Sequence, residues 1–507
     1  MVKKGKIWGF TLLVLMLASV KYATGIELGE KSRSATSSAP VETLRAEEAF
    51  DVFLPLLLGP EAEKALCRYG VNYASSASGD NPANYDLTAL YIGWYLNYSA
   101  NASSGVPEAI KHSAIISLSQ TDYVNYTYAT SPPAATIQQL AAANPGKTWY
   151  IGNEPDRVVY QNDLEPHVYA EAYHDLYHLL KAADPTAVVV AGTIVQATPV
   201  RLTYLDMVLD HYQTTYGEAM PVDAWSIHGF ILNEVSCDYD LSNCWGAEIP
   251  QGVDVGVGEI VTIEDNDNYD LFVERIVRFR SWMAERGYRN TPLYMSEFGI
   301  LMPAEYGFDA ARVNRFMDRT FTYMQNATDP ALGYHYDGNR LVQRWAWYSV
   351  ADALNFNGWL YSPVSKALSP MGANFAAFTA AVEEETDLYP ARVTAPAVRY
   401  DGSPATVTLY ATIANSGNRQ AATRPVSVRF YDSNDQQIGS TQNVTLRGCG
   451  DHATVSVSWA DRDAGTHAYY VIVDGDGAVT ETNEHNNRLD GQALVATGQV
   501  GLPLVSR

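Results

Sequence analysis

The sequence predicts a (β/α)8 TIM barrel followed by a C-terminal all-β sandwich of the immunoglobulin-like type. Two observations carry this prediction. Between residues 63 and 387, eight short apolar runs alternate with segments of helical periodicity, as in a barrel of parallel strands. Between residues 388 and 498, helical periodicity ends, and runs rich in Val, Thr and Tyr alternate polar and apolar residues between turn-forming segments, as in a β-sandwich.

Eight strands are predicted in the first of these regions. Most are continuous apolar runs, as expected for parallel strands that are buried on both faces. A doubly wound open sheet is the alternative, but no glycine-rich phosphate loop follows the first strand, which favours the barrel. The predicted strands are Tyr69–Tyr73, Tyr91–Asn97, Ala114–Leu118, Thr148–Asn153, Ala187–Gly192, Ala224–His228, Leu293–Ser296 and Val342–Tyr348.

Helical spacing is clear in three segments between these strands. Pro166 opens the first helix, because proline suits the first helical turn. The second repeats apolar residues on one face over 272–283 and ends near Gly287. The third begins after Asp309, whose side chain is of the type that caps helix N-termini.

The N-terminus reads as a secretory signal over residues 1–25. Three lysines precede the apolar stretch Ile7–Val20, which is too short to span a bilayer comfortably. An uncleaved anchor is the alternative. Residues 26–62 are predicted to be a linker and residues 499–507 a tail. We therefore expect a secreted or cell-surface protein, and we expect it to be a monomer.

The net charge excludes some classes of partner. Lys plus Arg is 34 and Asp plus Glu is 57, which gives a formal net charge of −23. A nucleic-acid-binding protein needs a basic face, and so does a protein that docks on anionic lipid. Neither partner is expected. The 34 tyrosines and 10 tryptophans are compatible with sugar binding and equally with a Tyr-rich secreted surface.

Four cysteines are present. Cys237 and Cys244 lie close together in a polar loop, and an oxidising compartment favours a disulfide between them. Cys67 and Cys449 are far apart in sequence and in different predicted domains, so no pairing is assigned to them and the question is left open. No CxxC or Cys/His spacing suggests zinc, and we predict neither a metal nor a cofactor.

Two glutamates close predicted strands of the barrel. Glu154 follows the fourth strand and Glu297 follows the seventh. Catalytic groups of TIM barrels project from the C-terminal ends of strands, so both carboxylates are expected at the barrel mouth. Two facing carboxylates suit glycoside hydrolysis, in which one protonates the leaving oxygen and the other attacks the anomeric carbon or activates water. Mutual repulsion keeps one of them protonated.

The motifs around these glutamates resemble a known clan. Asn153-Glu154-Pro155 and Glu297-Phe298-Gly299 look like the retaining β-glycosidases of clan A. This resemblance implies that Glu154 is the acid/base, that Asn153 contacts the sugar 2-hydroxyl, and that Glu297 is the nucleophile.

A narrower resemblance covers roughly residues 67–380. Gly93–Tyr98, Gly152–Asp156 and Trp225–Gly229 resemble the alkali-sensitive-linkage type of glycosyl hydrolase core, to which the endo-β-1,3-glucanases of glycoside hydrolase family 128 belong. One departure concerns an arginine that many clan A enzymes carry on strand two, because none stands in Tyr91–Asn97.

Other residues are candidates for substrate binding. His228 is expected to hydrogen-bond the nucleophile or a sugar hydroxyl. The alternative is a histidine of the core whose ring nitrogens are hydrogen-bonded within the protein. In the clan, an aromatic residue of strand eight forms the floor of the sugar site, which here implies Trp345 or Trp347, with Trp345 favoured. Core packing is at least as good an explanation for four weaker candidates, which are Asn72, Trp94, Tyr95 and Trp359.

The C-terminal region resembles the bacterial cell-adhesion-related (CARDB) β-sandwich. The residues that carry this resemblance are Ile413–Gly417 and Val473–Asn487. Asp474 and Asp476 invite a calcium interpretation, but the loop lacks EF-hand spacing, and a tight hairpin turn explains them better. Such a module would contact a cell surface or a polymer, or only act as a spacer.

Two functions are therefore compared. One is a secreted retaining glycoside hydrolase acting on a β-linked polysaccharide, with β-1,3-glucan as a candidate. The other is a non-catalytic carbohydrate-binding or adhesion protein built on the same barrel. The presence of both Glu154 and Glu297 favours the hydrolase. A transglycosylase would share the site, and the linkage and the endo or exo action are left open.

Overall fold

The computed structural model describes residues 64–74, 79–158, 161–236, 245–352 and 356–497. The predicted signal, linker and tail and the predicted Cys237–Cys244 bridge lie outside these residues. None of the helices in the described ranges combines the length and apolar character that a membrane crossing requires.

Eight parallel strands close into a barrel, as predicted. Each strand pairs in parallel with the next, and the first pairs with the last, so the sheet has no open edge within the ring. The strands are β1 (Leu66–Asn72), β2 (Ile92–Leu96), β3 (Lys111–Asp122), β5 (Thr148–Ile151), β6 (Val188–Ile194), β7 (Ala224–His228), β8 (Leu293–Phe298) and β9 (Arg344–Trp347).

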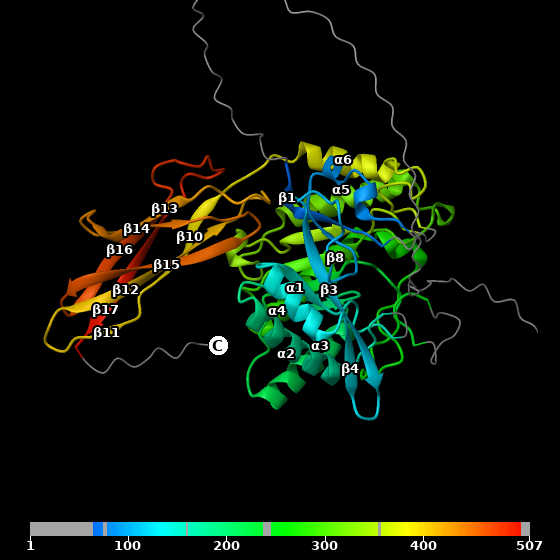
Figure 1. Cartoon of the computed structure of the whole chain (residues 1–507), viewed down its shortest axis with the longest axis horizontal. Coiled ribbons are helices and arrows are strands. Elements are labelled where there is room, and N and C mark those ends of the chain that lie inside the picture. The colour runs from blue at the N-terminus through cyan, green and yellow to red at the C-terminus, as the bar shows by residue number, and fades with distance from the viewer. Residues whose placement is uncertain (1–63, 75–78, 159–160, 237–244, 353–355, 498–507) are drawn as a thin grey trace, which may run out of the picture. The chain divides into compact units, whose positions relative to one another are not determined.

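Six α-helices of the described chain accompany the strands (Figure 1). Pro166 begins α2 as predicted, and the Asp309 side chain caps α5 by accepting a hydrogen bond from Arg312 N at 2.8 Å. The helices are α1 (Ala134–Ala143), α2 (Pro166–Ala183), α3 (Pro199–Tyr216), α4 (Tyr269–Glu285), α5 (Ala310–Asn326) and α6 (Pro370–Ala381). The short 3-10 helices are η1 (Pro82–Asn84), η2 (Leu87–Leu90), η3 (Ile263–Asp267), η4 (Ala304–Tyr306) and η5 (His335–Asp337).

Alternate residues of each barrel strand face opposite sides. A small inner cluster fills the barrel, and its members include Trp94, Tyr150, Tyr294 and Ala346. A larger cluster lies between the strands and the helices. Gly70 on β1 makes room inside the barrel, because a Cβ there would lie 2.4 Å from the Trp94 ring.

A hairpin outside the ring was not predicted. Strand β4 (Thr127–Ser131) pairs antiparallel with the second half of β3. Its residues alternate between exposed and half-buried, so the sequence carries no apolar run that marks it as a strand.

The C-terminal region is a sandwich of two sheets, as predicted. One sheet has the order β10–β12–β15 and the other β11–β17–β16–β13–β14, and the residues between them form a separate apolar cluster. The strands are β10 (Leu388–Thr394), β11 (Val398–Arg399), β12 (Ala405–Asn415), β13 (Val426–Asp432), β14 (Gln437–Val444), β15 (Asp451–Arg462), β16 (Gly465–Val473) and β17 (Arg488–Ala496).

Asp474 and Asp476 form a turn, but not a tight hairpin. Gly477 N donates to Asp474 O at 2.9 Å, and the Asp474 carboxylate accepts from Ala478 N and Val479 N. Asp476 pairs with Arg429. Residues 474–487 separate β16 from β17, so the turn belongs to a longer connection.

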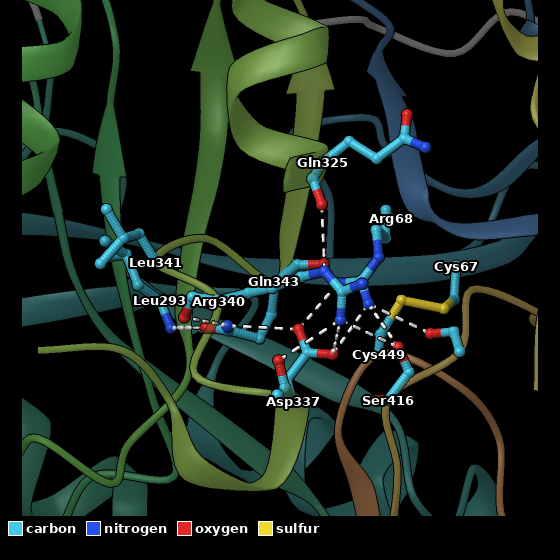
Figure 2. Close-up of polar contacts among 12 residues, drawn as sticks. Cys67, Arg68, Leu293, Gln325, Asp337, Arg340, Leu341, Gln343, Ser416 and Cys449 are labelled. Atoms are coloured by element: carbon cyan, nitrogen blue, oxygen red, sulfur yellow. Dashed lines mark hydrogen bonds and ion pairs between the residues drawn. A yellow bond between two sulfur atoms is a disulfide. The ribbon is translucent and has the colours of Figure 1, made fainter. Parts of the chain in front are cut away.

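Cys67 and Cys449 form a disulfide, a pairing that the sequence left open. The backbone brings β1 against residues 418–420, since Cys67 N donates to Asn418 O and Gln420 N donates to Ala65 O, both at 2.8 Å. Arg68 lies beside the bridge and binds Asp337 and the Ser416 carbonyl (Figure 2). Separation along the sequence therefore did not reflect separation in space.

We expect the Cys67–Cys449 disulfide to stabilise the fold substantially. It closes a loop across 382 residues, and loss of a cross-link of this kind costs about 2–4 kcal/mol, because the unfolded chain gains freedom. The Cys67→Ser/Cys449→Ser variant should therefore melt below the wild type in the absence of reductant. Calorimetry of both proteins with and without dithiothreitol measures this, and equal melting temperatures would refute it.

Candidate active site

Glu154 and Glu297 meet at one end of the barrel. Glu154 follows β5 by three residues, and Glu297 is the penultimate residue of β8. Because the strands are parallel, both side chains emerge at the C-terminal end of the barrel. A carboxylate oxygen of each and a ring nitrogen of His228 all lie within 4.8 Å of one another. The two glutamates are 3% and 5% exposed, respectively.

A tight backbone turn carries Glu154 out of the strand. Gly152 has φ +81° and Glu154 has φ +45°, a left-handed conformation that is uncommon for residues with a side chain and recurs at functional sites. Glu154 N donates to Thr193 O at 3.1 Å, and Asn153 N donates to Asn162 Oδ1 at 2.7 Å. These bonds fix the direction of the carboxylate.

His228, at the end of β7, lies between the two carboxylates. Its Nδ1 is 3.1 Å from Glu154 Oε1, and its Nε2 is 3.5 Å from Glu297 Oε1. The ring is completely buried. Burial opposes the charged imidazolium, but the two carboxylates raise the pKa of His228 above its ordinary value.

The two glutamates have different electrostatic surroundings. Burial raises the pKa of Glu154, but the nearby charges of Arg157, 3.2 Å away, and His228 outweigh it and lower that pKa to about 2. Burial raises the pKa of Glu297 to about 7, and the charge on Glu154 adds to this, although a hydrogen bond from Tyr98 opposes it. These surroundings therefore favour the negative charge on Glu154 and the proton on Glu297.

We expect Glu297→Gln to raise the melting temperature more at pH 8 than at pH 5. A carboxyl whose pKa is raised by folding stabilises the folded state when the pH is below its pKa in the unfolded chain, which is near 4.5. This stabilisation is lost as the pH rises through the folded-state pKa of about 7. Glutamine removes the cost of ionisation in that range. Thermal melts of both proteins at the two pH values test this, with the exposed Glu218→Gln as control; an equal difference at both pH values would contradict it.

Asn153 and Asn72 lie close to the glutamates. Asn153 is 7% exposed, and its side chain donates to Gln161 Oε1 at 3.3 Å. Asn72 is fully buried and donates to Ser296 O at 2.8 Å, and its Oδ1 lies 3.3 Å from the Tyr98 hydroxyl. Asn72 thus supports the neighbours of Glu297, and sugar contact by Asn153 stays a prediction.

The tryptophans of β9 point away from the site, which corrects the expectation that one of them forms its floor. Trp345 is fully buried with its ring 4.8 Å from that of Tyr69, and Trp347 donates to Gly358 O at 2.7 Å behind the strand. The inward-facing aromatic is Tyr348, directly after β9. Its ring lies 5.9 Å from that of Phe230, and both glutamates affect its pKa.

Trp94 and Tyr95 also lie outside the site. Tyr95 packs on the outer face of β2, where its hydroxyl accepts from Ser103 N at 2.9 Å. Trp94 fills the barrel interior. Trp359 is half-buried, with its ring 6.0 Å from that of Phe356. Successive residues of a strand point to opposite faces of the sheet. When both faces are apolar, the sequence does not indicate which residues point into the barrel.

Three residues at the site were not singled out from the sequence. Arg157 follows Glu154 by three residues, and its Nη2 also donates to Gly246 O at 3.1 Å. Tyr98 follows β2 by two residues and hydrogen-bonds Glu297. Their positions just after barrel strands were the available signal for both, as for Tyr348.

Glu154, His228 and Glu297 are also the group of described residues that has metal-ligand spacing. Each offers one ligand atom, which matches a three-ligand zinc site in number and type. Both nitrogens of the His228 ring, however, face a carboxylate, so the group is already joined by hydrogen-bonding and charge interactions. The contacts therefore describe a proton-sharing cluster.

Together these observations describe a TIM barrel followed by a C-terminal β-sandwich domain. Residues 385–490 match the CARDB domain family, and a domain from Methanosarcina acetivorans is 30% identical over 23% of this chain and 95% of its own length, with a TM-score of 0.19. No curated protein matches the chain.

The barrel is similar in structure to endo-β-1,3-glucanases of glycoside hydrolase family 128. The enzyme from Pseudomonas viridiflava is 13% identical, with 62% of this chain and 98% of that chain covered and a TM-score of 0.41. The enzyme from Sorangium cellulosum is 16% identical, with 61% and 98% covered and a TM-score of 0.38. At these identities the likeness concerns the fold.

Proposed function

We propose that this chain is a secreted retaining glycoside hydrolase that cleaves β-glycosidic bonds of a polysaccharide, with β-1,3-glucan as the first candidate. The observation that carries the proposal is that one carboxylate oxygen of Glu154 and one of Glu297 lie within 4.8 Å of each other at the barrel end. Retaining enzymes hold their carboxyl groups about 5–5.5 Å apart, whereas inverting enzymes need about 6.5–9.5 Å to admit a water.

The proposed reaction has two displacements. Glu297 attacks the anomeric carbon while Glu154 protonates the leaving oxygen, so the glycosidic bond breaks as the glycosyl–enzyme bond forms. Glu154, now ionised, then takes a proton from water as the water attacks the same carbon and releases Glu297. Tyr98 hydrogen-bonds Glu297 and would stabilise the carboxylate as it leaves.

His228 supplies a route for the proton that this reaction requires. The first step needs a protonated Glu154 and an ionised Glu297, the reverse of the resting distribution. With its proton on Nδ1, His228 accepts the Glu297 proton at Nε2 and passes the Nδ1 proton to Glu154. The number of protons in the cluster is unchanged, so the proton moves between the carboxylates without leaving the site.

The disulfide and the CARDB domain support the proposed location and partner. A structural disulfide is typical of proteins outside the reducing cytosol. We propose that the C-terminal domain contacts a cell surface or a polymer while the barrel acts on the polysaccharide.

One observation favours the second candidate, a non-catalytic carbohydrate-binding protein. Both glutamates are almost completely covered by their neighbours, as in a structural cluster of charges. Release of reducing sugar from laminarin, xylan, mannan and mixed-linkage glucan decides between the two. We expect release from at least one polymer and none from Glu297→Gln; binding without release by the wild type would establish the second candidate.

A further inference from the structure

The hairpin of β3 and β4 extends away from the barrel. Strand β3 pairs with β5 only over Ala114–Ile116, and from Ser117 to Asp122 its antiparallel partner is β4. At about 3.3 Å per residue, this second half is about 20 Å long. Figure 1 shows β3 continuing into the hairpin with β4, and β4 lies against α2, where the Tyr128 hydroxyl donates to Asp175 at 2.7 Å.

The tip of this hairpin is apolar and exposed. Tyr123 is 49% exposed, Val124 82% and Tyr126 45%. Asp122 is the one charged residue between positions 121 and 127. Neighbouring exposed apolar side chains of this kind mark a contact surface.

The tip is also held in one conformation. The Asp122 carboxylate accepts hydrogen bonds from Val124 N at 2.7 Å, Asn125 N at 2.9 Å and Asn125 Nδ2 at 2.7 Å. The Tyr126 ring packs edge-to-face on His167 with centroids 4.5 Å apart. A surface ordered in advance loses little conformational entropy when it binds a ligand.

The base of the hairpin is joined directly to the candidate active site. Asn162 Oδ1 accepts from Leu118 N at 3.2 Å and from Asn153 N at 2.7 Å, and Asn153 precedes Glu154. Gln120 Oε1 accepts from Glu165 N at 2.9 Å, just before α2. The tip therefore has a fixed position relative to the two glutamates.

We propose that Tyr123, Val124 and Tyr126 form a secondary binding surface for a neutral polysaccharide chain, which they contact outside the site of bond cleavage. This inference rests on the proposed function. Tyrosine rings offer apolar faces to the C–H faces of sugar rings, and their hydroxyls bond to water or sugar. The absence of Lys and Arg from positions 121–127 disfavours nucleic acid and anionic lipid.

The test compares Tyr123→Ala/Tyr126→Ala with the wild type. We expect the ratio of kcat/KM on laminarin to kcat/KM on laminaritriose to fall about tenfold, because only the polymer reaches the tip. Retardation in native gels that contain laminarin should also fall. Val277→Ala, which removes an exposed apolar side chain of α4, is the control and should change neither quantity.

Several outcomes would overturn the inference. One is an unchanged ratio together with unchanged retardation. Another is that laminarin does not retard the wild type. A third is that Tyr123→Ala/Tyr126→Ala loses binding to phosphatidylcholine vesicles but keeps its retardation by laminarin, which would indicate a membrane contact. Gel retardation does not need turnover, so it tests the tip in Glu297→Gln as well. A wild type that binds laminarin through the tip but hydrolyses no glycan would refute only the proposed function.

Discussion

Glu297→Gln and Glu154→Gln are each expected to lower kcat on the preferred polysaccharide by roughly 10³-fold or more, a loss typical for removal of a group that acts directly on the reacting atoms. Glutamine keeps the size of the side chain but supplies neither a nucleophile nor a proton. Because the two residues act in different steps, their variants should fail differently. Initial rates of reducing-sugar release measure the loss.

A substrate with an activated aryl leaving group separates the two roles. Such a leaving group needs no protonation, so Glu154→Gln should still form the glycosyl–enzyme, and added azide should then react with it and restore turnover. In Glu154→Gln the glycosyl azide should keep the configuration of the substrate, whereas Glu297→Gln has no nucleophile, so azide can react there only by direct displacement and with inversion. A retained glycosyl azide from Glu297→Gln would exchange the two roles. Activity above a tenth of wild type in either variant would show that the reaction does not use these glutamates.

Asp337→Ala is expected to lower the free energy of unfolding by about 3–5 kcal/mol, because it leaves a buried arginine without its partner. Arg68 and Asp337 are 2% and 0% exposed, and they form a two-point pair at 2.7 and 2.8 Å. Arg68 also donates to the carbonyls of Ser416 and Gly417, so the pair joins the barrel to the first turn after β12. Urea unfolding followed by tryptophan fluorescence measures the change.

Two further variants make this result interpretable. Asp490→Ala removes the carboxylate of an exposed pair with Arg488 and should change the free energy of unfolding by about 0–1 kcal/mol. Arg68→Met/Asp337→Leu replaces both buried charges by apolar groups and should recover much of the loss. If Asp337→Ala were no more destabilising than Asp490→Ala, the contact in Figure 2 would be unimportant for stability.

The barrel strands and the two glutamates could be predicted because each is marked by a short, continuous sequence pattern. Apolar runs predicted all eight barrel strands, and Glu154 and Glu297 stood out because each ends such a run. Parallel strands then bring the ends together whatever their separation along the chain. The pairing of the two carboxylates thus followed from topology.

The orientation of β9, the disulfide and two side chains of the site depend on contacts between distant parts of the chain, which local sequence patterns do not indicate. At the end of β9, a shift of one position decides whether Trp347 or the next residue, Tyr348, faces the site, and the residues on both sides are apolar. The Cys67–Cys449 bridge depends on the meeting of β1 with residues 418–420. Arg157 and Tyr98 act through contacts with residues that only the folded chain places beside them.

The bridge between β1 and the C-terminal domain has a consequence for biosynthesis. Cys67 is translated 382 residues before Cys449, an interval of roughly 20–75 s at about 5–20 residues per second. The barrel partners of β1 are β2 and β9, which are made earlier, so the ring of strands can close while Cys67 is still a free thiol. A ribosome that stops before Cys449 therefore yields a barrel without its cross-link to the C-terminal domain.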